Sequence, residues 1–164
     1  MRFAIAALPH TFPLRDDPGA IDLARHWATA DAQTELLEHL EQEFDGFAVS
    51  TRFDSGIQHP EVWSGERAVL WSHLVPPPDP FKRAQRTTEA VIIRSPRTPL
   101  YAPATSVSSG DVLRRGQTAK SAKWTRWVLA HLGAIPGEDT VVDFFTRQPV
   151  PAFTTMLTLE GIHA

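Results

Sequence analysis

Short apolar runs alternate with two amphipathic helices along this chain, and that alternation constrains the fold more than any other feature. Strands are predicted at 2–8, 47–51, 68–75, 89–94 and 140–145. Helices are predicted at 31–44 and 120–132. Strands separated by helices favour an α/β fold, in which a mainly parallel sheet of about five strands is flanked by helices.

The two helices are the clearest elements of the pattern. In the first, Asp31 is the expected N-cap and the sequence Asp45-Gly46 ends the helix. Its apolar residues recur at helical spacing: Leu36, Leu37, Leu40 and Phe44. In the second, Gly133 is the expected stop, and one face carries Trp124, Trp127, Val128 and Leu132.

The remaining segments give weaker patterns. Short helices are predicted at 19–27 and 59–63, and the tail 152–164 is either a helix or an outer strand of the sheet. Residues 95–118 hold three prolines, several serines and no periodicity, which is typical of a long loop. A chain of 164 residues suits one domain, so we expect a single unit over 1–164.

Composition excludes several classes of protein. The absence of cysteine excludes disulfides, thiolate zinc sites and a cysteine nucleophile, and it is compatible with the cytoplasmic location that we expect. No stretch approaches the ~20 apolar residues needed to cross a bilayer, and the histidines show no metal-ligand spacing, so neither a membrane nor a metal is expected as a partner.

A net charge of -3 conceals a strong asymmetry. Residues 1–81 carry 5 basic and 13 acidic side chains, whereas residues 82–126 carry 10 basic and 2 acidic ones. A basic segment of this kind attracts phosphate backbones or an acidic protein. The alternative is that it pairs with acidic residues of its own chain.

The segment from Lys120 to Phe145 joins the second helix to Leu-Gly, Pro-Gly-Glu-Asp and Val-Val-Asp143-Phe-Phe. This order resembles DNA N6-adenine and N4-cytosine methyltransferases of the permuted, phage type, in which the helix and the following strand form the S-adenosylmethionine site. Phe3 to Pro9 resembles the strand that precedes the catalytic Asp-Pro-Pro-Tyr turn of these enzymes, and Thr88 to Ile92 resembles a segment that often reads Trp-Glu-Pro-Val. The resemblance implies a truncated Rossmann-like methyltransferase fold, with 141–142 beside 3–5 and both long helices packed on the sheet.

The chain departs from the family at both motifs that carry its chemistry. Ala7-Leu8-Pro9-His10 stands at the Asp-Pro-Pro-Tyr position, so the group that accepts the target amino hydrogens is missing. Thr146-Arg147-Gln148-Pro149 replaces the glycine turn that lets the backbone approach the cofactor. Lys120 and Asp143 remain only as vestigial cofactor positions. Two strands that extend the family's sheet are also not found after the cofactor strand.

These departures predict a catalytically inactive methyltransferase-like protein, with no catalytic residue and no cofactor. We expect it to bind DNA or a protein partner, either a methyltransferase subunit or a host protein, and to be phage-encoded. The alternative is a divergent S-adenosylmethionine-dependent DNA methyltransferase. The expected binding surface is basic and consists of Lys82, Arg83, Arg86, Arg114 and Arg115. Oligomeric state is left open.

Overall fold

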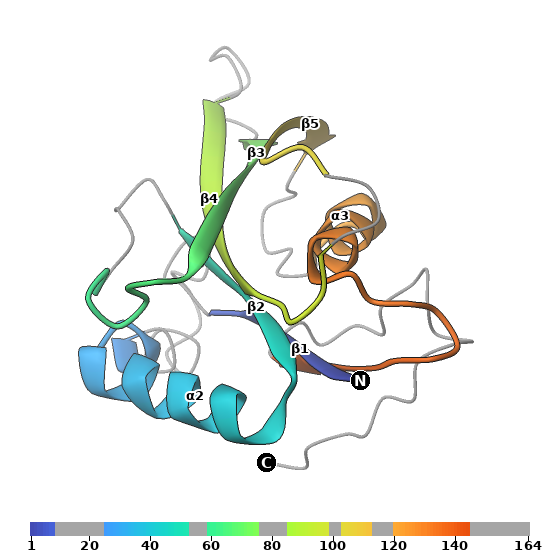
Figure 1. Cartoon of the computed structure of the whole chain (residues 1–164). Coiled ribbons are helices and arrows are strands. Elements are labelled where there is room, and N and C mark those ends of the chain that lie inside the picture. Colours follow the sequence, from blue (N-terminus) through green and yellow to red (C-terminus); the bar gives the residue numbers. More distant parts are fainter. Residues whose placement is uncertain (9–24, 53–58, 76–84, 99–102, 113–119, 145–164) are drawn as a thin grey trace.

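The computed structural model describes residues 1–8, 25–52, 59–75, 85–98, 103–112 and 120–144, which form a sheet with helices on both faces (Figure 1). The strands are β1 (Arg2–Ala7), β2 (Gly46–Arg52), β3 (Arg67–Val75), β4 (Gln85–Arg94), β5 (Ser106–Val112) and β6 (Thr140–Phe144). The helices are α2 (Ala30–Glu43) and α3 (Ala122–Leu132).

The six strands lie in the order β5-β3-β4-β2-β1-β6. β1 pairs in parallel with both β2 and β6, and β3 pairs in parallel with β5. β4 is antiparallel to both of its neighbours, so it alone is reversed. Phe3 pairs with Val141 and Ala4 with Val142, which confirms the predicted neighbourhood of the first and last strands.

The helices cover opposite faces of the sheet (Figure 1). Because side chains alternate along a strand, Phe3 and Ile5 of β1 pack in the cluster that includes α3, whereas Ala4 and Ala6 pack in the cluster that includes α2. The prediction that both long helices pack on the sheet is therefore confirmed, and the α/β class with it. We call the two sides of the sheet the α3 face and the α2 face.

The prediction of five strands and of a long loop over 95–118 was wrong. β5, Ser106–Val112, lies inside that range and pairs with β3 alone, as an outer strand of the sheet. Its sequence, Ser-Val-Ser-Ser-Gly-Asp-Val, lacks the apolar alternation that indicates a buried strand. An outer strand with exposed side chains, such as Ser106 and Ser108, does not need that pattern.

Two local predictions were also wrong. Residues 59–63 form turns instead of a helix: the N–H of Val62 bonds back to the carbonyl of His59, whose φ of 56° is left-handed. The N-cap of α2 is Thr29, not Asp31, because the Thr29 hydroxyl accepts from the N–H of Ala32 at 3.3 Å. Asp31 lies in the first turn, where its charge favours the helix dipole.

The expected C-terminal stop of α3 is confirmed, since Gly133 caps the helix at φ 66° in the left-handed conformation. Of the predicted helix 19–27, residues 25–27 are described and are helical. The tail 152–164 lies outside the described residues.

Candidate functional site

Three parallel strands end side by side at one end of the sheet, which we call its carboxyl end. β1 ends at Ala7, β2 at Arg52 and β6 at Phe144. Ala7 lies opposite Ser50 in the register, and the N–H of Leu8 donates to the Ser50 carbonyl at 3.2 Å. Open α/β sheets bind their ligands beyond the carboxyl ends of their strands, so we take this end as the candidate functional site.

Three polar side chains meet on the α3 face near this end, and we call them the carboxyl-end cluster: Ser50 of β2, Glu89 of β4 and Lys120, two residues before α3. Ser50 follows Ala48 by two positions, and Glu89 precedes Val91 by two. Because Ala48 and Val91 both belong to the core under α3, the strand alternation brings Ser50 and Glu89 to that face. The Ser121 cap on the N–H of Trp124 begins the helix directly after Lys120.

Each of the three side chains in the carboxyl-end cluster contacts the other two. The Lys120 ammonium forms an ion pair with Glu89, donates to the Ser50 hydroxyl at 3.2 Å and lies 5.1 Å from the centre of the Trp124 ring. The Ser50 hydroxyl donates to the same Glu89 oxygen. Ser50 is 4% exposed and Glu89 is 6% exposed, so both residues are shielded from bulk water.

These contacts form a closed network: the Ser50 hydroxyl donates to Glu89, and the same carboxylate is paired with the Lys120 ammonium, which also donates to Ser50. Two buried charges at such a site are tolerated because each has its counter-ion and further hydrogen-bond or ring contacts. The cluster therefore fixes the start of α3 on the sheet.

Of the two positions that the resemblance compares with cofactor-binding residues, Lys120 belongs to this cluster. Asp143 lies on β6 opposite Ile5, at intermediate exposure. It follows Val141 by two positions and so shares the α3 face with the cluster. Sequence reasoning noted Glu89 only as part of a family-like segment, and it gave no role to Ser50. An acidic residue just before the buried run Ala90–Ile93 was the available signal.

Residues 7–10, which the resemblance compares with the family's catalytic turn, lie partly within the described residues. Ala7 ends β1, and Leu8 packs against the apolar cluster on the α2 face. His10, Arg147 and Gln148, with Pro9 and Pro149, lie outside the described residues.

None of the five residues predicted to form a basic surface has a described side chain, so their grouping stays a prediction. Lys82, Arg83, Arg114 and Arg115 lie outside the described residues. Arg86 lies in β4 opposite Leu74, and its side chain is not described.

Three other cations of the basic segment pair with carboxylates of the chain. Arg94 pairs with Glu41 of α2 and with Glu66, and Arg97 pairs with Asp139. With Lys120 on Glu89, these pairs bear out the internal neutralisation that was the alternative, as far as these residues are concerned. Lys123 and Arg126, on the exposed side of α3, form no ion pair with any described residue.

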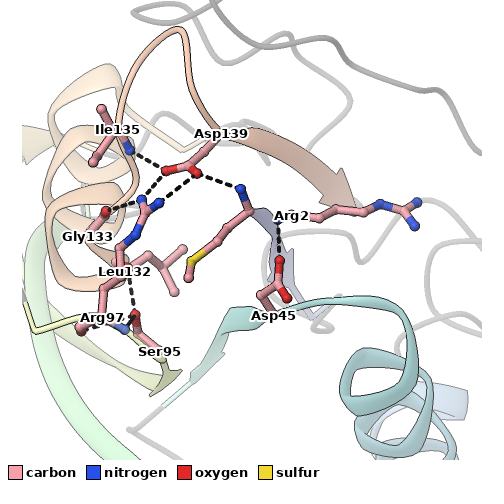
Figure 2. Close-up of polar contacts among 9 residues, drawn as sticks. Arg2, Asp45, Ser95, Arg97, Leu132, Gly133, Ile135 and Asp139 are labelled. Carbon is pink, nitrogen blue, oxygen red and sulfur yellow. Dashed lines mark hydrogen bonds and ion pairs between the residues drawn. The ribbon is translucent and has the colours of Figure 1, made fainter.

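The opposite, amino end of the sheet holds a second polar group, which we call the amino-end cluster: Met1, Arg97 and Asp139 (Figure 2). The Asp139 side chain is 0% exposed. Its carboxylate accepts from the N-terminal ammonium at 2.8 Å, from the N–H of Ile135 at 2.6 Å and from two nitrogens of Arg97. Arg97 also donates to the Gly133 carbonyl at 3.1 Å.

These donors set the protonation of Asp139. Burial acts to raise the pKa of the carboxyl group, but the ammonium, the Ile135 N–H and the Arg97 guanidinium together hold that pKa below its ordinary value. Sequence reasoning missed this cluster, because Arg97 and Asp139 are 42 positions apart and each lies in a loop.

Comparison with known proteins adds no relative: no protein-family model matches the chain, and no curated protein matches it. Within the described ranges, no group of three histidine or acidic side chains is arranged to hold a metal ion. None of the described helices has the length and apolar character to cross a membrane.

Proposed function

We propose that this chain is a non-catalytic, methyltransferase-like binding protein. The sequence resemblance motivates the proposal, and the topology supports it. β6 lies beside β1 as that resemblance implies, although their sequences are separated by more than 130 residues. α2 and α3 also cover the sheet as expected.

The end of β1 is the observation that carries the loss of catalysis. The methyltransferases that the sequence resembles need a carboxylate or amide and an aromatic ring just beyond the corresponding strand, to accept the amino hydrogens and to stack on the flipped base. Ala7 offers no acceptor in its side chain, and Leu8 is turned into the apolar cluster under α2.

The residues present also do not fit S-adenosylmethionine. The ammonium of Lys120 is engaged by Glu89 and Ser50. Residues 145–150 read Phe-Thr-Arg-Gln-Pro-Val and contain no glycine for a close approach to the cofactor. We therefore propose no methyl-transfer step.

Calorimetric titration with S-adenosylmethionine tests this proposal. We expect binding no tighter than about 1 mM, a free energy of about -4 kcal/mol, and no transfer of labelled methyl groups to duplex DNA. A micromolar dissociation constant together with methyl transfer would overturn the proposal in favour of a divergent methyltransferase.

Duplex DNA is the partner that we propose for the basic segment. Arg94, Arg97 and Lys120 are neutralised within the chain. The proposed contact residues remain those first named from the sequence: Lys82, Arg83, Arg86, Arg114 and Arg115. Contacts of arginine and lysine to phosphates need charge and reach but no base recognition, so this binding would be independent of sequence and sensitive to salt.

A matched pair of double variants tests the DNA assignment. R114A/R115A and K123A/R126A each remove two positive charges, but only the first removes proposed contacts. We expect R114A/R115A, and separately K82A/R83A/R86A, to weaken duplex binding and to flatten its salt dependence, with a smaller effect of K123A/R126A. If wild-type protein binds no DNA at low salt, the DNA assignment is lost and an acidic protein partner replaces it.

A further inference from the structure

His131, in the last turn of α3, is a completely buried histidine that the proposed function does not use. Its ring lies between β3 and the segment 103–105 that leads into β5. On one side, Nδ1 lies 3.3 Å from the Arg67 guanidinium, and on the other, Nε2 lies 3.3 Å from the Ala104 carbonyl. The Trp127 ring packs edge-on against it, 4.7 Å between centres.

These two contacts specify one protonation state. A guanidinium only donates and a carbonyl only accepts, so Nδ1 must accept and Nε2 must carry the hydrogen. That assignment is the neutral ring. A second proton on Nδ1 would point at Arg67 and place two positive charges together in a partly buried contact.

The other charges around the helix end do not compensate. Arg67 is the charged group recorded at the ring, and it also donates to the His131 carbonyl. Arg97 and Asp139, which surround the following Gly133, are paired with each other. Desolvation by burial is the main cause that lowers the pKa of His131; the hydrogen bond to the Ala104 carbonyl opposes it, and the Arg67 charge adds a smaller lowering effect.

Three described residues donate hydrogen bonds to the segment 103–105: His131, Trp127 and Leu70. The Ala104 carbonyl accepts from His131 and also from the Trp127 indole N–H at 2.9 Å. The Thr105 carbonyl accepts from the N–H of Leu70 at 2.8 Å, and β5 begins at the next residue. β5 pairs with β3 alone, so this attachment fixes the start of an outer strand.

We propose that His131 is an acid-sensitive latch, whose protonation expels the ring from between Arg67 and Ala104 and releases the β5 side of the sheet. The latch is closed at neutral pH, where the ring is neutral in both the closed and the open form. As pH falls below ~6.5, the ordinary value for histidine, the open form takes up a proton that the closed form resists. Opening therefore becomes more favourable with acid until the closed form is protonated as well.

Hydrogen exchange of the wild-type chain between pH 7 and pH 5 tests the latch. After correction for intrinsic rates, we expect the protection of β5 amides to fall severalfold, because the open form takes up a proton that the closed form resists. The protection of β1 and β2 amides should be unchanged, and the Trp127 indole resonance should shift over the same pH range. Loss of protection in all strands together would overturn the proposal, because it would show global unfolding.

Two variants separate the latch from a general effect of acid. In His131→Gln, the amide accepts from Arg67 and donates to Ala104 but does not titrate, so the pH dependence of β5 protection should disappear. Arg67→Met removes a charge that disfavours the protonated ring in the closed form, so the pH-dependent loss of β5 protection should become smaller, which keeps the test informative if the first variant does not fold. A wild-type pH profile in both variants would overturn the proposal.

Discussion

Each end of the sheet buries one carboxylate against one cation, but the two ion pairs are built differently. At the carboxyl end, Glu89 binds the side chains of Ser50 and Lys120. At the amino end, the carboxylate of Asp139 also binds the main-chain N–H of Ile135, and Arg97 binds the carbonyl of Gly133. The first cluster is thus a side-chain contact between elements, whereas the second also completes the backbone hydrogen bonding of the loop that precedes β6.

The largest effect should come from Asp139→Ala. This change leaves Arg97 without its counter-ion and Ile135 without its acceptor, and removing one partner of a buried pair costs about 3 kcal/mol or more. Urea unfolding measures the loss. The control is Glu43→Ala, which breaks an exposed pair with Arg2 and should cost below about 0.5 kcal/mol. Equal losses in the two variants would contradict the structural role of Asp139.

A smaller loss of stability is expected when both partners of an ion pair are replaced by apolar residues. This replacement tests the difference between the two clusters most directly. Lys120→Met alone leaves Glu89 uncompensated and should cost about 2–3 kcal/mol, but Glu89→Leu with Lys120→Met should return to within about 1 kcal/mol of the wild type. The equivalent replacement of Arg97 and Asp139 should not recover, because the N–H of Ile135 stays unsatisfied. Recovery at both ends, measured by urea unfolding, would remove the distinction between the clusters.

The smallest effect should follow Ser50→Ala. The hydroxyl contributes one hydrogen bond to a network whose ion pair remains, so we expect a loss of about 1 kcal/mol in the free energy of unfolding. Thr34→Ala removes an exposed hydroxyl bond to the Ala30 carbonyl and should cost less than about 0.5 kcal/mol. A loss above that of Lys120→Met would mean that Ser50, not the ion pair, holds the cluster together.

The spacing of apolar residues in the sequence correctly predicted the two long helices. Helical spacing identified α2 and α3, and the glycine that ends α3, because burial of one helix face imposes that spacing. The adjacency of β1 and β6 followed from the family resemblance, not from periodicity. β5 was not predicted, because an outer strand with exposed serines does not show the apolar alternation of a buried strand.

The candidate site was less predictable than the fold. Lys120 was noted from the resemblance, but its pairing with Glu89 and Ser50 depends on the register of β2 and β4, which no local pattern specifies. The charge asymmetry also overstated the free positive charge. Arg94 and Arg97 find their carboxylates in distant segments, and a count along the chain does not detect such pairs.

The place of β1 inside the sheet has a consequence for biosynthesis. β1 is translated before the other described strands and gains β2 early, but its other neighbour, β6, leaves the ribosome roughly 140 residues after β1 begins. Until then, the edge of the apolar strand β1 that will pair with β6 has unpaired N–H and C=O groups. Such an edge can pair with strands of other chains and lead to aggregation. The pairing of β1 with β6 joins the two neighbouring strands that are farthest apart along the chain, so we expect its formation to limit the folding rate.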